Sequence, residues 1–242
     1  MIKGYPSILP RSYQVLTELP RRAIFLISAN NSINEKYMRY LEFRRLMGEF
    51  AVFSLADIRQ ADPDFARRRL NEWQDKGYIR KVIKGYYIFA DAALDEKIIF
   101  EIANRIYAPS YVSFEMALAY HGLIPESVYG ITSASTRKTM LFKTALGNFQ
   151  YRTIHPKLYF GFDCLSAAGK CAKLASLEKA LLDYVYLHPE LRNADDFAKL
   201  RINREVFVKS ADRKKLAGYA AVYGTRSLSR RLEVFLEYID HA

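Results

Sequence analysis

The chain has 242 residues, of which 50% are hydrophobic, and 37 Lys plus Arg against 26 Asp plus Glu give it a formal net charge of +11. This length allows a buried core, and the aromatic content of 14% excludes a disordered basic tail. The positive excess favours a polyanionic partner such as nucleic acid but does not identify one.

The cysteine count argues against both a disulfide scaffold and a structural zinc site. Cys164 and Cys171 do not have the spacing of a CxxC pair, and the four histidines lie far from them in the sequence. We therefore expect two reduced thiols in a cytoplasmic protein, with no metal and no cofactor. The apolar run at 23–29 is too short to span a membrane, which takes about 20 apolar residues.

The first third of the chain predicts short elements in a definite order. Residues 1–32 contain three prolines and predict a loosely attached arm. Apolar residues at helical spacing then predict a helix that ends before Gly48. A short strand follows at 50–54, and Ser54 is a suitable N-cap for the next helix.

A third helix is predicted from 64 to 76, where Gly77 stops it, and two apolar-basic runs then predict a hairpin that turns at Lys84 and Gly85. Helix, strand, helix, turn, helix and hairpin make up the element order of a winged helix-turn-helix domain, which we place at 33–95. We expect Phe65, Leu70 and Trp73 to form the buried side of the third helix.

The third helix and the hairpin carry most of the basic residues of this region. A run of three arginines alone is most often a solvated helix face, but the element order favours insertion of this helix into the major groove of double-stranded DNA. Arginine pairs well with guanine and Asn71 with adenine, whereas Lys81 and Lys84 suit phosphates. The candidate DNA-contacting residues are Ser54, Arg59, Arg67, Arg68, Arg69, Asn71, Arg80, Lys81, Lys84 and Tyr86.

The remainder, 96–242, predicts a mixed α/β C-terminal domain. Helices are expected at 97–107 and after Ser113 and Ser176, and strands of a small antiparallel sheet at 129–135, 149–155 and 158–162. A further strand at 170–176 and three C-terminal helices complete the elements, so the predicted fold class is α+β.

The sequence contains no pattern that supports catalysis. Glu178 and Lys179 are adjacent, which excludes the ExK spacing of restriction-type nucleases, and no phosphate-binding loop or HExxH is present. We expect His121 and His155 to have packing or capping roles. The prediction is that the protein is not an enzyme.

Three segments carry a family resemblance. YVSFEMALAYHGLIP at 111–125 resembles the YxSxxxALxxHGLIP segment of AbiEi-type antitoxins, which are transcriptional regulators of bacterial abortive-infection toxin–antitoxin pairs. KGYYIF at 84–89 resembles the end of their wing, and SLEKALLDYVYLHP at 176–189 resembles their S/PEKALLD helix. The likeness extends over about 36–190 and includes neither the arm nor the residues after 200.

The resemblance implies a winged helix that binds the operator of its own operon, usually inverted repeats. It also implies a C-terminal antitoxin domain that counteracts a neighbouring toxin of nucleotidyltransferase fold, whether or not by direct contact. The matching positions, which the resemblance makes fold-defining, are Tyr111, Ser113, Ala117, Leu118, His121, Gly122 and Leu123. The alternative is a stand-alone winged-helix regulator whose C-terminal domain senses a ligand or dimerises.

Overall fold

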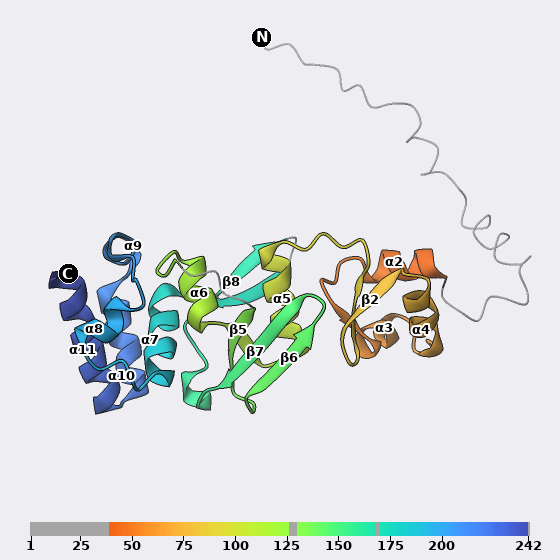
Figure 1. Cartoon of the computed structure of the whole chain (residues 1–242). Helices are drawn as coiled ribbons and strands as arrows, with labels where there is room; N and C mark the ends of the chain where they lie inside the picture. The colour runs from red at the N-terminus through yellow and green to blue at the C-terminus, as the bar shows by residue number, and fades with distance from the viewer. Residues whose placement is uncertain (1–38, 126–129, 168–169, 242) are drawn as a thin grey trace, which may run out of the picture.

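A computed structural model of the chain describes residues 39–125, 130–167 and 170–241 and has a mixed α+β fold (Figure 1). The predicted arm at 1–32 lies outside the described residues. The molecule is elongated, with the N-terminal helices and a small sheet at one end, a larger sheet in the middle and helices at the other end. Within the described ranges, no helix is long and apolar enough to cross a bilayer.

The N-terminal elements follow the predicted order, with two differences in length. The predicted 64–76 helix begins only at Arg68, because Phe65 N–H donates to the carbonyl of Asp62 in a turn that precedes it. The strand predicted at 50–54 is reduced to its last two residues. The elements are α2 Tyr40–Met47, β1 Phe53–Ser54, α3 Leu55–Ala61, α4 Arg68–Asp75, β2 Ile79–Ile83 and β3 Tyr86–Phe89.

Aromatic side chains hold these elements together. Phe43 of α2 lies 4.4 Å from Trp73 of α4 and 5.2 Å from Phe53 of β1, measured between ring centroids. Leu70 and Trp73 of α4 and Phe65 in the turn before it are buried, which confirms that these three predicted residues face the core. Dense aromatic packing of this kind fixes the orientation of α4 and therefore the direction in which its polar face points.

The small antiparallel sheet, in the order β1-β3-β2, has apolar residues on both faces. Tyr87 and Phe89 of β3 belong to the aromatic cluster around Phe43, whereas Ile88 between them belongs to the larger core of the second part. Successive strand residues point to opposite faces, so the sheet lies between the two cores. Val82 of β2 also packs into the larger core.

The second sheet is not the small antiparallel sheet expected for the C-terminal part. It has six strands in the order β6-β7-β5-β4-β9-β8 and is mixed, because β5 pairs with β7 and β4 with β9 in parallel. The segment predicted as a strand at 158–162 is mostly a short 3-10 turn and loop, and β8 begins only at Phe162. The strands are β4 Ser110–Val112, β5 Ile131–Ser135, β6 Met140–Thr144, β7 Gly147–Thr153, β8 Phe162–Ala167 and β9 Lys170–Ala175.

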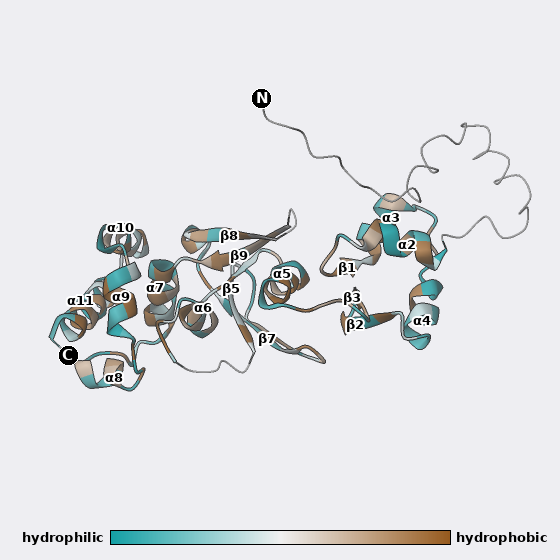
Figure 2. Ribbon diagram, turned by 90° about the horizontal axis from the view of Figure 1, so that it is seen from above, coloured by the Kyte–Doolittle hydropathy of each residue, from teal (hydrophilic) through white to brown (hydrophobic). Residues whose placement is uncertain are grey.

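Helices surround this sheet and extend the molecule beyond it. α5 connects the two sheets, and Figure 2 shows α8 to α11 clustered at the end opposite β1 to β3. The predicted helices of this part are present, with Asp95 and Ser176 as side-chain N-caps. The helices are α5 Glu96–Ile106, α6 Phe114–Tyr120, α7 Leu177–Leu187, α8 Ala194–Ala198, α9 Arg204–Ser210, α10 Arg213–Tyr223 and α11 Arg226–His241.

The expectation of two reduced thiols is wrong for this structure. Cys164 of β8 and Cys171 of β9 form a disulfide with an S–S distance of 2.08 Å. The two strands form an antiparallel hairpin, which brings the Cα atoms of the cysteines to 5.0 Å. A spacing of seven residues is typical of neither a CxxC pair nor a zinc site. The register of the two strands, which the sequence does not show, places the cysteines within disulfide-bonding distance.

Candidate nucleic-acid interface

The polar face of α4 is the centre of the predicted DNA-contacting group. Arg67, Arg68 and Asn71 are exposed, while Leu70 and Trp73 fix the opposite face of the helix in the core. Arg68 Nε donates to Glu72 Oε1 at 3.1 Å, a solvent-exposed pair one turn apart. Such a pair contributes at most about 1 kcal/mol, so the guanidinium can exchange this partner for a phosphate or base at little cost.

Arg69, the third arginine of the run, has a different environment. It is half-buried, and its guanidinium carbon lies 5.9 Å from the centre of the Trp73 ring. This position over an aromatic face has a packing role of its own. The structure therefore groups Arg67 and Arg68 with Asn71 and sets Arg69 apart.

The hairpin presents its basic residues in more than one direction. Arg80 and Lys81 are both exposed, but their strand partners are Ile88 and Tyr87, which face different cores. Lys81 thus belongs to the sheet face that packs on the N-terminal helices, and Arg80 to the face turned toward the second part. Lys84 is exposed at the turn, where Gly85 with a φ of 90° reverses the chain.

Three predicted residues lie apart from the α4 group. Ser54 forms a capping box with Asp57 at the start of α3, so its hydroxyl already has a structural role. Tyr86 is half-buried opposite Ser54 in the strand register, whereas Tyr87 is buried. Arg59 is exposed on the last turn of α3.

Ser54 and Tyr86 border a cavity of about 410 Å³ between the two parts of the chain. Asn104 and Arg105 of α5 and Lys173 of β9 line its other side. Arg105 closes one edge, because its Nη2 lies 2.9 Å from Oδ1 of Asp57 on α3. This ion pair connects the N-terminal elements to the second part.

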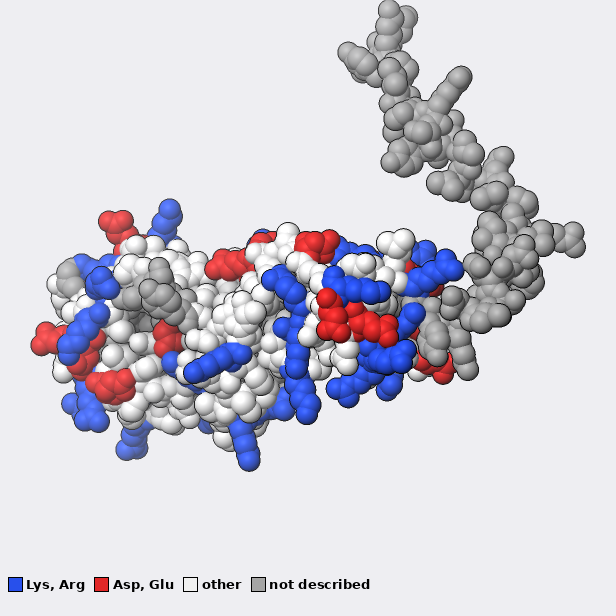
Figure 3. Space-filling view, turned by 45° about the vertical axis from the view of Figure 1, so that its right-hand side comes forward, with Lys and Arg blue, Asp and Glu red and all other residues white. Residues whose placement is uncertain are grey.

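Basic side chains are numerous at the N-terminal end of the molecule. Figure 3 shows Lys and Arg side chains over much of the visible surface there, interrupted by a patch of acidic side chains. Electrostatic attraction to a polyanion depends on such groups being presented together and solvated. The exposed members near α4 and the turn include Arg67, Arg68, Lys76, Lys81 and Lys84.

The residues that carry the family resemblance meet in the interior and form a polar network. Asp183 of α7 accepts hydrogen bonds from Tyr111 Oη at 2.8 Å, Ser113 Oγ at 2.8 Å and Tyr223 Oη at 2.6 Å. Lys179, one turn earlier on α7, donates to the same carboxylate. Ser113 precedes α6 as predicted, but its hydroxyl binds Asp183 instead of capping that helix.

Burial dominates the electrostatics of this network. Lys179 and Asp183 are both 0% exposed. Burial lowers the pKa of the Lys179 ammonium, and burial followed by the nearby Asp183 charge raises the pKa of Tyr111 and of Tyr223. The groups are enclosed and hydrogen-bonded to one another, which is typical of a network that stabilises a fold.

The two histidines considered in the sequence have the structural roles expected of them. His121 is the C-cap of α6, and its Nε2 lies 2.8 Å from the carbonyl oxygen of Ala175. His155 Nδ1 accepts from Lys157 N–H at the short 3-10 turn. Among the described residues, no group of three or more His, Cys, Asp or Glu side chains could hold a metal ion.

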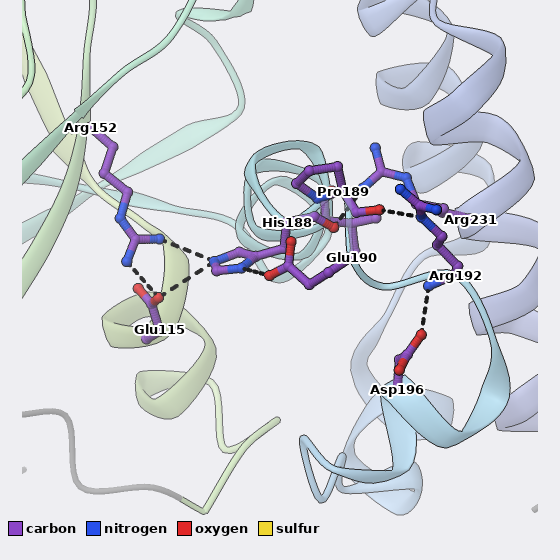
Figure 4. Close-up of polar contacts among 9 residues, drawn as sticks. Glu115, Arg152, His188, Pro189, Glu190, Arg192, Asp196 and Arg231 are labelled. Carbon is purple, nitrogen blue, oxygen red and sulfur yellow. Dashed lines mark hydrogen bonds and ion pairs between the residues drawn. The ribbon is translucent and has the colours of Figure 1, made fainter.

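A second polar cluster, which the sequence did not reveal, surrounds His188 at the end of α7 (Figure 4). Its Nδ1 donates to Glu190 at 2.6 Å, and its Nε2 lies 3.8 Å from Glu115. The Glu115 and Glu190 carboxylates outweigh burial and raise the pKa of His188, and Nη1 of Arg152 lies 3.3 Å from its Nε2. Burial disfavours the Glu115 carboxylate, but His188 and Arg152 lower its pKa on balance.

Comparison with known proteins provides no family assignment. No protein-family model matches the chain. No curated protein matches it either.

Proposed function

We propose that the protein is a DNA-binding antitoxin that represses its own toxin–antitoxin operon and counteracts a cognate nucleotidyltransferase-like toxin. The proposal combines the AbiEi-type resemblance with one structural observation. This observation is the exposed basic face of α4, held rigidly by Leu70 and Trp73 and followed by a hairpin with Lys84 at its turn.

In this proposal the N-terminal elements act as a winged helix. α4 is the recognition helix, with Arg67, Arg68 and Asn71 directed at base edges of double-stranded DNA. The β2–β3 hairpin is the wing, and Lys81 and Lys84 bind phosphates. The separate position of Arg69 leaves it a supporting role through its contact with Trp73.

The same proposal assigns antitoxin activity to the second part and places the protein in the cytoplasm, where an operator and a toxin would both be found. The Cys164–Cys171 disulfide is uncommon for a cytoplasmic protein. The location therefore rests on the resemblance and on the proposed DNA partner.

A gel-shift assay on the DNA upstream of the operon tests the first half. Arg67→Ala with Arg68→Ala should weaken binding strongly, because both side chains are exposed, Arg68 in the first turn of α4 and Arg67 directly before it. The matched control is Lys209→Ala with Lys214→Ala, which removes the same charge from exposed residues of α9 and α10. Equal binding by both double variants and by the native protein would exclude α4 from the interface.

Co-expression with the adjacent reading frame tests the second half. If that frame encodes a nucleotidyltransferase-like toxin, this protein should restore growth when both are induced. If growth is not restored while operator binding is intact, the antitoxin activity is refuted and the protein is a DNA-binding regulator only.

A stand-alone regulator that senses a ligand is the second candidate, and the cavity beside Ser54 and Tyr86 favours it. The cavity lies between the proposed DNA-binding elements and α5, so a ligand there could change their relative orientation. A neighbouring gene without a toxin, together with operator binding that responds to a small molecule, would support this function over the first.

A further inference from the structure

Four arginines surround one cavity at the end of the molecule remote from the proposed DNA-binding elements. The cavity has a volume of about 550 Å³ and is lined by Pro189, Arg192, Arg226, Ser227, Arg230 and Arg231. This volume lies within the usual range of small-molecule sites. The lining is basic and offers no aromatic ring among the described residues that form it.

Arg231 is the fixed component of the cavity wall. It is only 8% exposed, and its Nη1 donates to the carbonyl oxygens of Val185 and His188, while its Nε donates to that of Ser227. Burial and the neighbouring positive charge of Arg192 lower the pKa of Arg231, against the opposing effect of Glu190. Neutral carbonyls hold the guanidinium in place, but they do not neutralise its charge.

The other three arginines that line the cavity are Arg192, Arg226 and Arg230. Arg226 and Arg230 are exposed and lie one turn apart on α11, so they share a face of that helix. Arg192 Nε donates to the Pro189 carbonyl at 3.1 Å, and Figure 4 shows Arg192 and Arg231 side by side. Within the described part of the chain, none of these three side chains forms an ion pair with a carboxylate.

Acidic residues near the cavity are engaged elsewhere or lie outside it. Glu190 is bound to His188 Nδ1 at 2.6 Å. Glu233 lines a neighbouring surface hollow with Arg226 and Arg230, but does not line this cavity. None of the described residues that line the cavity is acidic, so its positive charge is concentrated.

The N-terminus of α11 adds to this charge. α11 begins at Arg226 and has 16 residues, and Ser227 in its first turn lines the cavity. The positive end of a helix dipole and its first N–H groups favour an anion. The N-terminus of α11 therefore adds to the attraction for anions that the four arginines provide at this cavity.

We propose that this cavity is a binding site for a small molecule that carries two or more linked phosphate groups, such as a nucleoside diphosphate or triphosphate. Guanidinium groups match phosphate oxygens with paired hydrogen bonds, and four of them exceed what a single phosphate can satisfy. Because none of the described lining residues has an aromatic ring, the site recognises the phosphates and not the base. The site is independent of the proposed operator-binding surface.

Isothermal titration calorimetry with pyrophosphate, ATP, inorganic phosphate and adenosine tests this site on the full chain. We expect pyrophosphate and ATP to bind with similar affinity, inorganic phosphate to bind about tenfold or more weakly, and adenosine not to bind. Arg226→Gln with Arg230→Gln should weaken pyrophosphate binding by about tenfold or more, because both residues are exposed and can be changed without affecting the core.

Lys209→Gln with Lys214→Gln is the matched control, since it removes the same net charge from exposed residues outside the cavity. Native-like pyrophosphate binding by this control, together with weak binding by the arginine variant, supports the site. The absence of pyrophosphate binding to the native chain, or equal affinity of both double variants, would overturn it.

Operator gel shifts with the same variants separate this site from the proposed function. The arginine variant should bind operator DNA like the native chain. If instead it loses operator binding and retains pyrophosphate binding, the arginines form part of a DNA surface and the small-molecule site is refuted.

Discussion

Replacement of Asp183 by alanine should destabilise the protein strongly, because it leaves the buried Lys179 ammonium without its carboxylate partner. The carboxylate is the common acceptor for Tyr111, Ser113, Tyr223 and Lys179. Without it, the ammonium group of Lys179 stays in a fully buried position with no counter-charge. Removal of one member of a buried ion pair costs about 3–5 kcal/mol.

Part of the environment of Lys179 would survive the change. Its Nζ still donates to Tyr223 Oη at 2.7 Å and lies 5.0 Å from the ring centres of Phe160 and Tyr223. These contacts stabilise a cation, but a hydroxyl and aromatic faces do not replace a carboxylate. Three hydroxyl groups also lose their acceptor. We therefore expect the free energy of unfolding to decrease by about 3–5 kcal/mol.

Urea unfolding followed by far-UV circular dichroism measures this free energy. Glu237→Ala on the exposed face of α11 is the control and should change it by no more than about 0.5 kcal/mol. The double variant Lys179→Met with Asp183→Ala removes the unpaired charge and should recover part of the loss. A loss below about 1 kcal/mol for Asp183→Ala alone would refute the idea that the network stabilises the fold.

Three further predictions concern DNA binding, pH and packing. Arg67→Ala and Arg68→Ala should each cost about 1–3 kcal/mol of operator-binding free energy. Lys84→Ala should weaken binding to all DNA sequences alike and reduce the dependence of log K on log salt concentration by about one unit of slope. Gel shifts at two salt concentrations measure both effects. The pKa of His188 is raised above its ordinary value of 6.5, so its ionic contacts stabilise the fold fully below that pH and are lost as pH rises through the higher folded pKa. In the His188→Gln variant the urea midpoint should therefore depend less on pH above 6.5 than in the native protein. Gly161→Ala should lower the thermal midpoint, because the added Cβ would lie 2.9 Å from the Tyr219 ring at a φ of 72°. An unchanged salt slope, pH profile or thermal midpoint would contradict the corresponding prediction.

Local features of the sequence determined the elements that depend on neighbouring residues. The capping box at Ser54 needs only Asp57, three residues later. The hairpin turn needs only the positive φ that glycine adopts easily at position 85. The buried side of α4 follows from the helical spacing of Leu70 and Trp73. Short-range geometry of this kind can be read from the residues themselves.

Contacts between distant segments were decided only by the tertiary structure. Asp183 meets Ser113 across 70 positions, and the sequence shows neither the contact nor the buried charge of Lys179. The parallel pairing of β5 with β7 made the second sheet mixed, and the register of β8 with β9 joined Cys164 to Cys171.

The distribution of arginines illustrates the same division. The sequence showed three adjacent arginines near α4, but the packing of Arg69 over Trp73 separated it from the other two. It gave no sign that Arg192 would join Arg226, Arg230 and Arg231 around one cavity. Side-chain direction and long-range packing are set by the whole fold, because each depends on which surfaces exclude water together.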